Sequence, residues 1–266
     1  MRTRSTGLNR WVDELQRAGR YAFTREEAAR VLDLSESTLD KTLQRTSLQG
    51  RILRLRRGFY VIVPLEYSAV GAAPTEWFID DLMGFLGKPY YVGCLSAAIW
   101  HGATHQRAQE TQVVVAGQLR SIETAAVRIR FLRHAGMQQA LTEKRRTQTG
   151  DVPVSTPEWT AIDVIRFQKH FGSMDAAATV LTELAETLHA KRLASAADHE
   201  PTTAYLQRLG WMLDFLGQEA LTASLHARVI QRNPAYTPLN ASLRARSGPR
   251  NPRWRIVVNE EPEADL

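Results

Sequence analysis

The residues best suited to a chemical role lie in one short basic stretch, and they are hydrogen-bonding rather than catalytic types. Leu39 and Leu43 are four positions apart, so they share one face of a predicted helix. At about 100° per residue, the opposite face carries Thr38, Lys41 and Arg45. Arg and Lys can reach guanine acceptors or phosphates, and Thr can bond base edges or phosphates. The pattern predicts a helix that enters the major groove of double-stranded DNA.

Three further hydroxyl-bearing residues surround this face. Ser37 and Thr42 flank it, and Ser35 precedes the helix as a candidate N-cap. A phosphate is favoured at a helix N-terminus, where backbone N–H groups are free. These residues are therefore predicted to contribute to DNA binding from the edges of the helix.

A basic hairpin is predicted directly after the helix, from Ile52 to Val63 (ILRLRRGFYVIV), with Gly58 in its turn. We expect Arg54 and Arg56 on one side of the first strand and Arg57 at the tip. Positive charge there would meet backbone phosphate or an adjacent minor groove. The complete set of predicted DNA-binding residues is Ser35, Ser37, Thr38, Lys41, Thr42, Arg45, Arg54, Arg56 and Arg57.

Two earlier helices must position these residues. The first, over residues 8–18, has apolar residues at helical spacing. The second is short and begins at Thr24, which can form a capping box with Glu27. A short helix, a tight turn, a longer helix and a basic hairpin predict a winged helix-turn-helix domain over residues 1–63.

The charge distribution supports this prediction. Residues 1–63 contain 13 Arg and Lys against 7 Asp and Glu, whereas residues 64–266 contain 21 of each. A basic module beside a neutral one is typical of a protein in which one part meets a polyanion. The alternative is a small helical bundle whose arginines keep an exposed hairpin from aggregating. The combination of capped helix, turn, basic helix and basic hairpin favours DNA binding.

The remainder of the chain predicts a second domain. Residues 64–74 (PLEYSAVGAAP) are rich in Pro, Gly and Ala and predict a linker. Residues 75–266 predict an α+β domain with a small sheet and a helix-rich final third. Helices are expected over 75–86, 95–101, 157–167, 175–189 and 203–230, strands over 111–115, 126–132, 153–154 and 254–259, a solvated basic loop over 244–253, and an acidic tail after 259.

Composition excludes a membrane-spanning protein. No stretch approaches the roughly 20 apolar residues that span a bilayer, and the N-terminus leads into polar sequence. We therefore expect a cytoplasmic protein with no membrane partner. The single cysteine, Cys94, lies in an apolar run and is interpreted as a small buried hydrophobic residue.

Catalytic signals in the sequence are weak throughout. His101 and His105 lack the neighbouring glutamate of the zinc-protease motif, and no Gly-rich phosphate loop, G-x-S-x-G elbow or paired-cysteine motif occurs. Asp80, Asp81 and Asp163 are interpreted as helix-surface or capping charges rather than a nuclease centre. We predict no enzyme activity, no cofactor and no metal site.

Several short motifs occur in a distinctive order: Phe23-Thr24 and the segment after it, Leu55–Tyr60 (LRRGFY), Tyr91–Gly93 (YVG) with Leu95–Ala98 (LSAA) and His101-Gly102, Val154–Glu158 (VSTPE) before Asp163, and Trp254–Asn259 (WRIVVN). In this order and spacing, the chain resembles the AbiEi family of antitoxins over nearly its whole length. AbiEi proteins are the transcription-repressing partners in type IV toxin–antitoxin systems.

This resemblance implies an operon shared with a nucleotidyltransferase-like toxin. It also implies that the first domain binds inverted repeats in its own promoter, while the second counteracts the toxin without necessarily forming a stable complex. The family's DNA contacts carry over to Thr38, Lys41, Arg45 and the hairpin arginines. Two alternatives retain the DNA binding: the second domain would sense a small-molecule ligand, or would process DNA with carboxylates that bind Mg²⁺.

Overall fold

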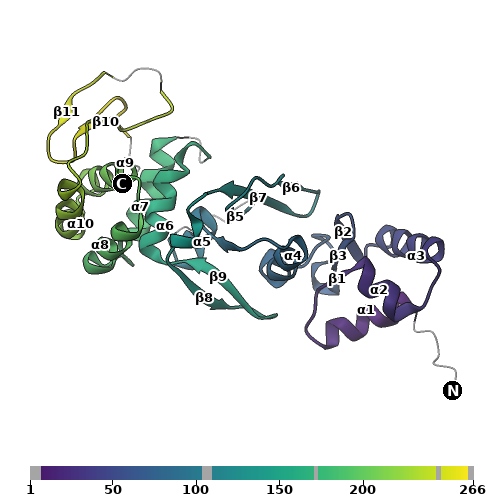
Figure 1. Cartoon of the computed structure of the whole chain (residues 1–266). Helices are drawn as coiled ribbons and strands as arrows, with labels where there is room; N and C mark the ends of the chain where they lie inside the picture. Colours follow the sequence, from purple (N-terminus) through teal and green to yellow (C-terminus); the bar gives the residue numbers. More distant parts are fainter. Residues whose placement is uncertain (1–6, 104–109, 171–172, 244–246, 263–266) are drawn as a thin grey trace. The chain divides into compact units, whose positions relative to one another are not determined.

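The computed structural model describes residues 7–103, 110–170, 173–243 and 247–262 (Figure 1). By its internal contacts the chain divides into two compact units: unit 1 comprises residues 1–90, 118–131 and 144–153, and unit 2 comprises residues 91–117, 132–143 and 154–266. Helices and strands both occur in quantity, so the predicted mixed α+β class is confirmed. The units are not consecutive stretches of sequence, unlike the linear division expected at residues 63 and 74.

Unit 1 begins with three helices and a small antiparallel sheet. Their order is α1 (Leu8–Arg17), β1 (Ala22–Thr24), α2 (Arg25–Leu32), α3 (Glu36–Leu48), β2 (Ile52–Arg56) and β3 (Phe59–Ile62), drawn in purple to blue in Figure 1. The helices and the hairpin predicted from the sequence are confirmed. Strand β1 was not expected, because three residues are too few for an alternating pattern to be recognised. It pairs antiparallel with β3, which lies between β1 and β2.

Local interactions explain where these elements begin and how they pack. Thr24 forms the predicted capping box: its hydroxyl accepts a hydrogen bond from the Glu27 backbone N–H at 3.1 Å, and the Glu27 carboxylate accepts from the Thr24 N–H at 2.9 Å. In the core, the Phe23 ring stacks on Tyr60 at 5.4 Å and meets the edge of Trp11 at 5.0 Å. Aromatic packing therefore joins α1 to the sheet.

The segment expected to be a linker is held by packing. Ala72 and Ala73 are buried, and the ring of Tyr67 meets that of Trp77 at 5.3 Å. Helix α4 (Ile79–Leu86) follows, and its Phe85 ring lies 5.3 Å from Phe59 at the start of β3. Unit 1 thus extends well beyond residue 63.

A six-stranded sheet has the strand order β6-β7-β5-β4-β9-β8. Its strands are β4 (Tyr90–Val92), β5 (Thr111–Val115), β6 (Ile122–Glu123), β7 (Arg128–Arg133), β8 (Thr142–Arg146) and β9 (Asp151–Ser155). The sequence predicts β5, β7 and β9. Strand β8 (TEKRR) was not predicted, because all of its residues are polar and none is fully buried. Within unit 2, β4 and β9 are parallel and pair through Val92 and Val154.

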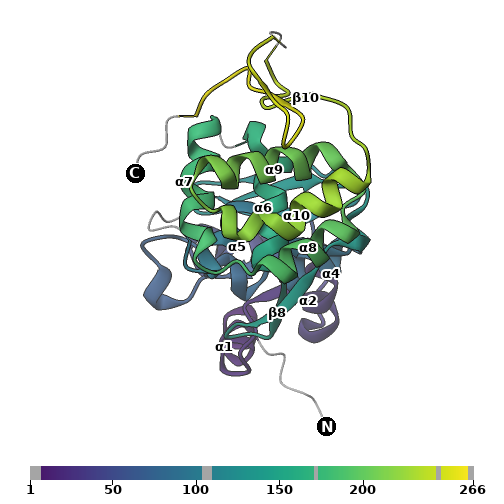
Figure 2. The same ribbon diagram turned by 90° about the vertical axis from the view of Figure 1, so that its left-hand side faces the viewer.

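Helices dominate unit 2, as Figure 2 shows: α5 (Cys94–Trp100), α6 (Pro157–Arg166), α7 (Met174–Ala185), α8 (Ala190–His199), α9 (Thr203–Phe215) and α10 (Glu219–Gln231). The single helical stretch expected over 203–230 is two helices, because Gly217 turns the chain with φ +72°. Helix α8 (AKRLASAADH) was missed, since alanines form most of its apolar face.

A small second sheet in unit 2 follows α10. It has the order β10 (Thr237–Pro238), β12 (Ile256–Val257) and β11 (Arg250–Asn251), so the strand expected over 254–259 is present as a shorter element. The predicted basic loop lies partly outside the described residues, at 244–246, and the acidic tail does so from residue 263. Trp254, just before β12, is completely buried and lies directly against Gly210 of α9.

The contact between Gly210 and Trp254 generates a stability prediction. A Cβ atom built on Gly210 would lie 2.2 Å from the Trp254 ring, so the indole would have to move. We expect Gly210→Ala to lower the free energy of unfolding by about 1–3 kcal/mol, measured by chemical denaturation.

Gly84 provides a matched control inside α4, because a Cβ atom built there has no neighbour within 4 Å. Gly84→Ala should leave stability unchanged or raise it by up to about 1 kcal/mol through helix propensity. A loss of stability in Gly84→Ala as large as that in Gly210→Ala would contradict the packing explanation.

Candidate nucleic-acid interface and the buried polar cluster

The exposed face of α3 carries the side chains predicted from the sequence. Leu39 and Leu43 are buried, whereas Thr38, Lys41 and Arg45 are exposed. Leu48, at the end of α3, is 82% exposed because it does not lie on the buried face that carries Leu39 and Leu43. A polar and basic surface is therefore available to a ligand along this helix.

Hydrogen bonds occupy the hydroxyl groups at the start of α3. Ser35 caps the helix by accepting from the Thr38 N–H at 3.4 Å, and the hydroxyls of Ser35 and Thr38 lie 2.8 Å apart. Ser37 lies 3.4 Å from Ser35 through their hydroxyl oxygens. The Thr42 hydroxyl donates to the Thr38 carbonyl at 2.8 Å. These four residues form a compact polar helix start, and Lys41 and Arg45 project beyond it as the longer side chains.

The three arginines of the hairpin have different surroundings. Arg54 is exposed, as is Arg57 at the tip, where Gly58 takes φ +85°. Arg56 is half-buried: its Nη2 donates to the Arg120 carbonyl, and its guanidinium lies 5.9 Å from the Phe131 ring centroid. Arg54 and Arg56 were expected on one side of the first strand, but the strand register shifts between them, so the regular alternation of sides is interrupted.

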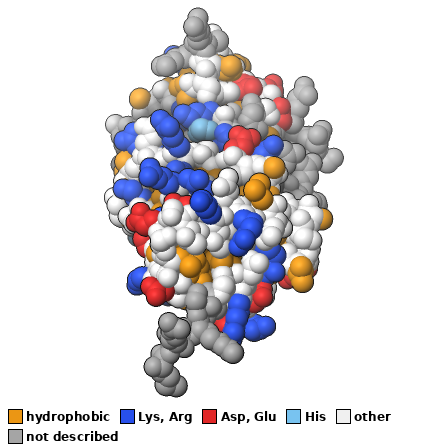
Figure 3. All heavy atoms as spheres, turned by 90° about the vertical axis from the view of Figure 1, so that its right-hand side faces the viewer, with side chains coloured by type: hydrophobic (Ala, Val, Ile, Leu, Met, Phe, Trp, Pro, Cys, Tyr) orange, Lys and Arg blue, Asp and Glu red, His pale blue; other side chains and the backbone are white. Residues whose placement is uncertain are grey.

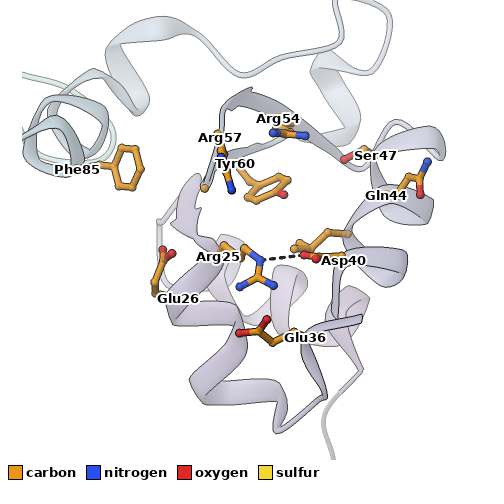
Figure 4. Close-up of a pocket in the computed structure, with 12 residues that line it drawn as sticks. Arg25, Glu26, Glu36, Asp40, Gln44, Ser47, Arg54, Arg57, Tyr60 and Phe85 are labelled. Atoms are coloured by element: carbon orange, nitrogen blue, oxygen red, sulfur yellow. Dashed lines mark hydrogen bonds and ion pairs between the residues drawn. The ribbon is translucent and has the colours of Figure 1, made fainter. Parts of the chain in front are cut away.

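A groove of about 860 Å³ separates α3 from the hairpin (Figure 4). Within it, Arg25 Nε donates to the Asp40 carboxylate at 2.8 Å, and this bond holds the pKa of Asp40 below its ordinary value. The backbone N–H of Arg25 also donates to the Gly58 carbonyl at 2.9 Å. Arg25 therefore connects the start of α2 both to α3 and to the turn of the hairpin.

Sequence reasoning missed several groove residues, namely Arg25, Gln44, Ser47 and Tyr60. Gln44 and Ser47 share with Asp40 the side of α3 next to the predicted face. A helical projection of α3 could therefore have indicated that Gln44 and Ser47 lie next to the predicted face. Arg25 and Tyr60 gave none, because their position beside α3 depends on how α2 and β3 pack.

The difference in net charge between the two units is larger than the difference between residues 1–63 and residues 64–266. Unit 1 contains 20 Arg and Lys against 13 Asp and Glu, whereas unit 2 contains 14 against 15. The segments 118–131 and 144–153 add basic residues to unit 1 that the linear division had assigned to the neutral domain. Figure 3 shows several Lys and Arg side chains close together on one face of the chain.

Unit 2 contains a buried ionic cluster centred on Arg166. Its guanidinium forms ion pairs with Asp163, one turn earlier on α6, and with Glu200, which follows α8. The three side chains are 4%, 0% and 1% exposed. Interpreting Asp163 as a surface or capping charge was therefore wrong. Its spacing from Arg166 on the helix gave no measure of how deeply α6 is covered by neighbouring helices.

Residues of the YVG motif surround the same cluster. The Tyr91 hydroxyl donates to Asp163 at 2.9 Å and accepts from the Trp159 indole N–H at 3.2 Å. A Cβ atom on Gly93 would lie 2.9 Å from Val114 and 3.1 Å from the Asp163 carboxylate, so the close approach requires glycine. Burial raises the pKa of Asp163 to about 6, against the opposing effect of Arg166. These motif residues stabilise the interior of unit 2 and do not form an open site that a substrate could enter.

Two further residues considered in the sequence, Cys94 and the motif residue His101, are also buried. Cys94 is fully buried, as predicted, and burial raises the pKa of its thiol well above the ordinary value, which disfavours a nucleophilic thiolate. His101 is buried, and its Nε2 lies 2.8 Å from the Ser155 carbonyl. His105 lies outside the described residues.

Among the described residues, no group of three or more His, Cys, Asp or Glu side chains is arranged to hold a metal ion. Within the same part of the chain, no helix is both long and apolar enough to cross a membrane.

These features define a mixed α+β protein with a basic unit and a nearly neutral unit built around a buried ion cluster. Residues 91–215 match the family model of the AbiEi antitoxin C-terminal domain. The match includes the YVG, LSAA and VSTPE motifs and does not extend to residues 1–90.

Solved structures extend the comparison of the fold. The crystal structure of the RV2827C protein from Mycobacterium tuberculosis is similar with a TM-score of 0.63 and 16% sequence identity, covering 96% of this chain and 92% of that chain. A nucleotidyltransferase-like antigenic protein from Paracoccidioides brasiliensis has a TM-score of 0.35 and 13% identity, covering 56% of this chain and 89% of that one, which is too low to carry an argument. A search of curated proteins found no significant match.

The ionic cluster generates a second stability prediction. Arg166→Met would leave two buried carboxylates without a counter-ion, so we expect the free energy of unfolding to fall by about 3–5 kcal/mol. Neutralising both carboxylates as well, in Arg166→Met/Asp163→Asn/Glu200→Gln, should recover much of that loss. Chemical denaturation measures both effects.

Arg228 is a suitable control, because its ion pair with Asp198 at 2.9 Å is exposed. Arg228→Met should cost less than about 1 kcal/mol. Equal losses from Arg166→Met and Arg228→Met would show that the buried cluster does not stabilise the fold as inferred.

Proposed function

We propose that this protein is an antitoxin of a type IV toxin–antitoxin system that also represses its own promoter. In this proposal residues 1–63 form a winged helix-turn-helix that binds double-stranded DNA, and the following domain counteracts a nucleotidyltransferase-like toxin. The observation that carries the proposal is the combination, in one chain, of an AbiEi antitoxin domain with a basic unit that exposes a basic helix and hairpin.

The element order of unit 1 supports the DNA-binding half. A short α2 followed by α3, and then by the β2–β3 hairpin, matches the arrangement in which the second helix of the pair enters the major groove. Lys41 and Arg45 are assigned to base edges, with Thr38 and Ser37 beside them. Ser35 and Thr42 are assigned to phosphates near the helix N-terminus.

The hairpin arginines are assigned different tasks. Exposed Arg54 and Arg57 are assigned to phosphate or the minor groove, because neutralising DNA phosphates releases counterions and strengthens binding. Arg56 acts by holding the hairpin in place through Arg120 and Phe131. In the groove, Arg25 neutralises Asp40, which limits the repulsion between this carboxylate and a nearby DNA strand.

The regulatory part of the proposal follows from the antitoxin family. The operator would consist of inverted repeats upstream of the protein's own gene, so that antitoxin levels control expression of the toxin. Toxin neutralisation is assigned to the domain that includes residues 91–215, with or without a stable complex between the two proteins. No cofactor, metal ion or catalytic step is invoked.

DNA recognition can be separated into sequence reading and phosphate contact. Lys41→Ala/Arg45→Ala should relax the preference for promoter over shuffled DNA, because base contacts are each worth about 1–3 kcal/mol of discrimination. Arg54→Ala and Arg57→Ala should weaken binding to both duplexes and reduce the salt slope by about one per lost phosphate contact. Fluorescence anisotropy at several salt concentrations measures both quantities.

Arg17 is the control for general loss of charge, since it is exposed on α1 and lies outside the groove. Arg17→Ala should leave sequence preference unchanged. Equal affinity of the wild-type protein for promoter and random DNA would refute sequence-specific repression.

Antitoxic activity is expected to be separable from DNA binding. Co-expression with the nucleotidyltransferase-like product of the neighbouring gene, both from unrelated promoters, should restore growth. Lys41→Ala/Arg45→Ala should restore growth as well as the wild type does, because its antitoxin domain is intact. Failure of the wild-type chain to restore growth would remove the antitoxin assignment, and failure of the double variant alone would show that the DNA-binding face takes part in neutralisation.

A further inference from the structure

Unit 2 contains a cavity of about 350 Å³ that none of the roles above uses. It lies among the end of α6, the turn Gln168–His170, helix α9 and the chain that follows β10. Figure 2 shows α9 on the side facing the viewer, below β10. The cavity is lined by Ile165, Arg166, Gln168, Lys169, Tyr205, Arg208, Leu239, Ala241 and Ser242.

Two of its three cations lack a carboxylate partner among the described residues. Arg208 is half-buried, and its guanidinium donates to the Pro238 carbonyl at 3.0 Å and to the Thr237 hydroxyl at 3.1 Å, both of which are uncharged. Burial lowers the pKa of Arg208, as expected for a cation without a counter-ion. Lys169 is exposed at the rim.

The third cation, Arg166, forms the inner wall of the cavity and belongs to the ionic cluster. Its charge is balanced by Asp163 and Glu200, and its guanidinium lies 5.5 Å from the centroid of the Tyr205 ring. Its Nε is buried and has no hydrogen-bond partner within the described part of the chain. A buried donor left without a partner costs free energy that a bound acceptor would recover.

We propose that this cavity binds a phosphate group carried by a small ligand. The guanidinium of Arg208 and the ammonium of Lys169 supply positive charge, and Tyr205 and Ser242 add hydroxyl groups at the same site. Planar guanidinium groups match phosphate oxygens through paired hydrogen bonds, whereas an ammonium contributes a compact charge. The volume lies near the lower end of small-ligand sites, which fits inorganic phosphate or a mononucleotide.

This site is independent of the proposed DNA interface. Every lining residue belongs to unit 2, whose net charge is slightly negative, and the excess positive charge that favours DNA lies in unit 1. The cations of the cavity therefore lie outside the unit that carries the excess positive charge. A ligand bound here would contact α6 and α9 of the proposed antitoxin domain. The concentration of that ligand could then regulate the domain.

The test uses the full-length protein and isothermal titration calorimetry at constant ionic strength. The probes are inorganic phosphate, adenosine 5′-monophosphate and a short duplex DNA without operator sequence. Saturable binding of phosphate or the nucleotide is expected. Lys169→Glu should weaken it by about tenfold, corresponding to the loss of one charged hydrogen bond. Arg208→Gln should do the same, and thermal denaturation will show whether it remains folded.

Lys191 is the matched control, because it is exposed on α8 and lies outside the cavity. Lys191→Glu should change affinity for phosphate and nucleotide by less than about twofold, and Lys41→Gln/Arg45→Gln should likewise leave it unchanged.

Three results would overturn the proposal: no saturable binding of either small probe, equal losses from Lys169→Glu and Lys191→Glu, or an effect of Lys169→Glu confined to duplex DNA. The last result would identify the phosphates as those of a DNA backbone. Because the small-probe measurement does not involve operator or toxin, its outcome is distinguishable from success or failure of the proposed function.

Discussion

Arg166 holds two carboxylates inside unit 2, and the elements of that unit are arranged around this interaction. Asp163 lies on the same helix, Glu200 follows α8, and the Tyr91 hydroxyl brings β4 to the cluster. Glu200 also accepts from the Thr202 N–H at 2.7 Å, at the start of α9. Charges taken out of water are tolerated when they are paired and hydrogen-bonded. The cluster therefore fixes the relative positions of a strand and three helices, in addition to the contacts of the hydrophobic core.

A smaller ion pair has a comparable positioning role in unit 1. Arg25 contacts Asp40 through its side chain and the turn of the hairpin through its backbone. It thus sets the spacing between α3 and the hairpin, and Phe85 supports the other side of the hairpin through Phe59. The proposed DNA-binding surface of α3 and the hairpin requires this spacing to be constant, because groove and backbone contacts must be made together. The exposed pair itself contributes little stability, so its value is geometric.

The motifs that carry the family resemblance also serve to position elements of the fold. Tyr91, Gly93 and Asp163 are distant in sequence and meet in one buried site, where a glycine is needed because a side chain would collide with Val114 and Asp163. His101 of the next motif is also buried, with its Nε2 2.8 Å from the Ser155 carbonyl, rather than open to a substrate. Motifs of this kind identify a fold, and the exposed cavity beside Arg166 is formed by residues outside them.

The sequence by itself determined the elements whose signals are local. Capping at Thr24 and Ser35, the apolar spacing of Leu39 and Leu43, and the Gly-containing hairpin turn all act within a few residues, so the first helices, the hairpin and the exposed face of α3 could be predicted. Tertiary structure alone decided which residues far apart in the chain meet. It turned Arg56 toward Phe131, buried Asp163, added polar strand β8 to a sheet and brought Lys169 and Arg208 to the same cavity. Burial and long-range pairing depend on the packing of whole elements, and no local pattern records that packing.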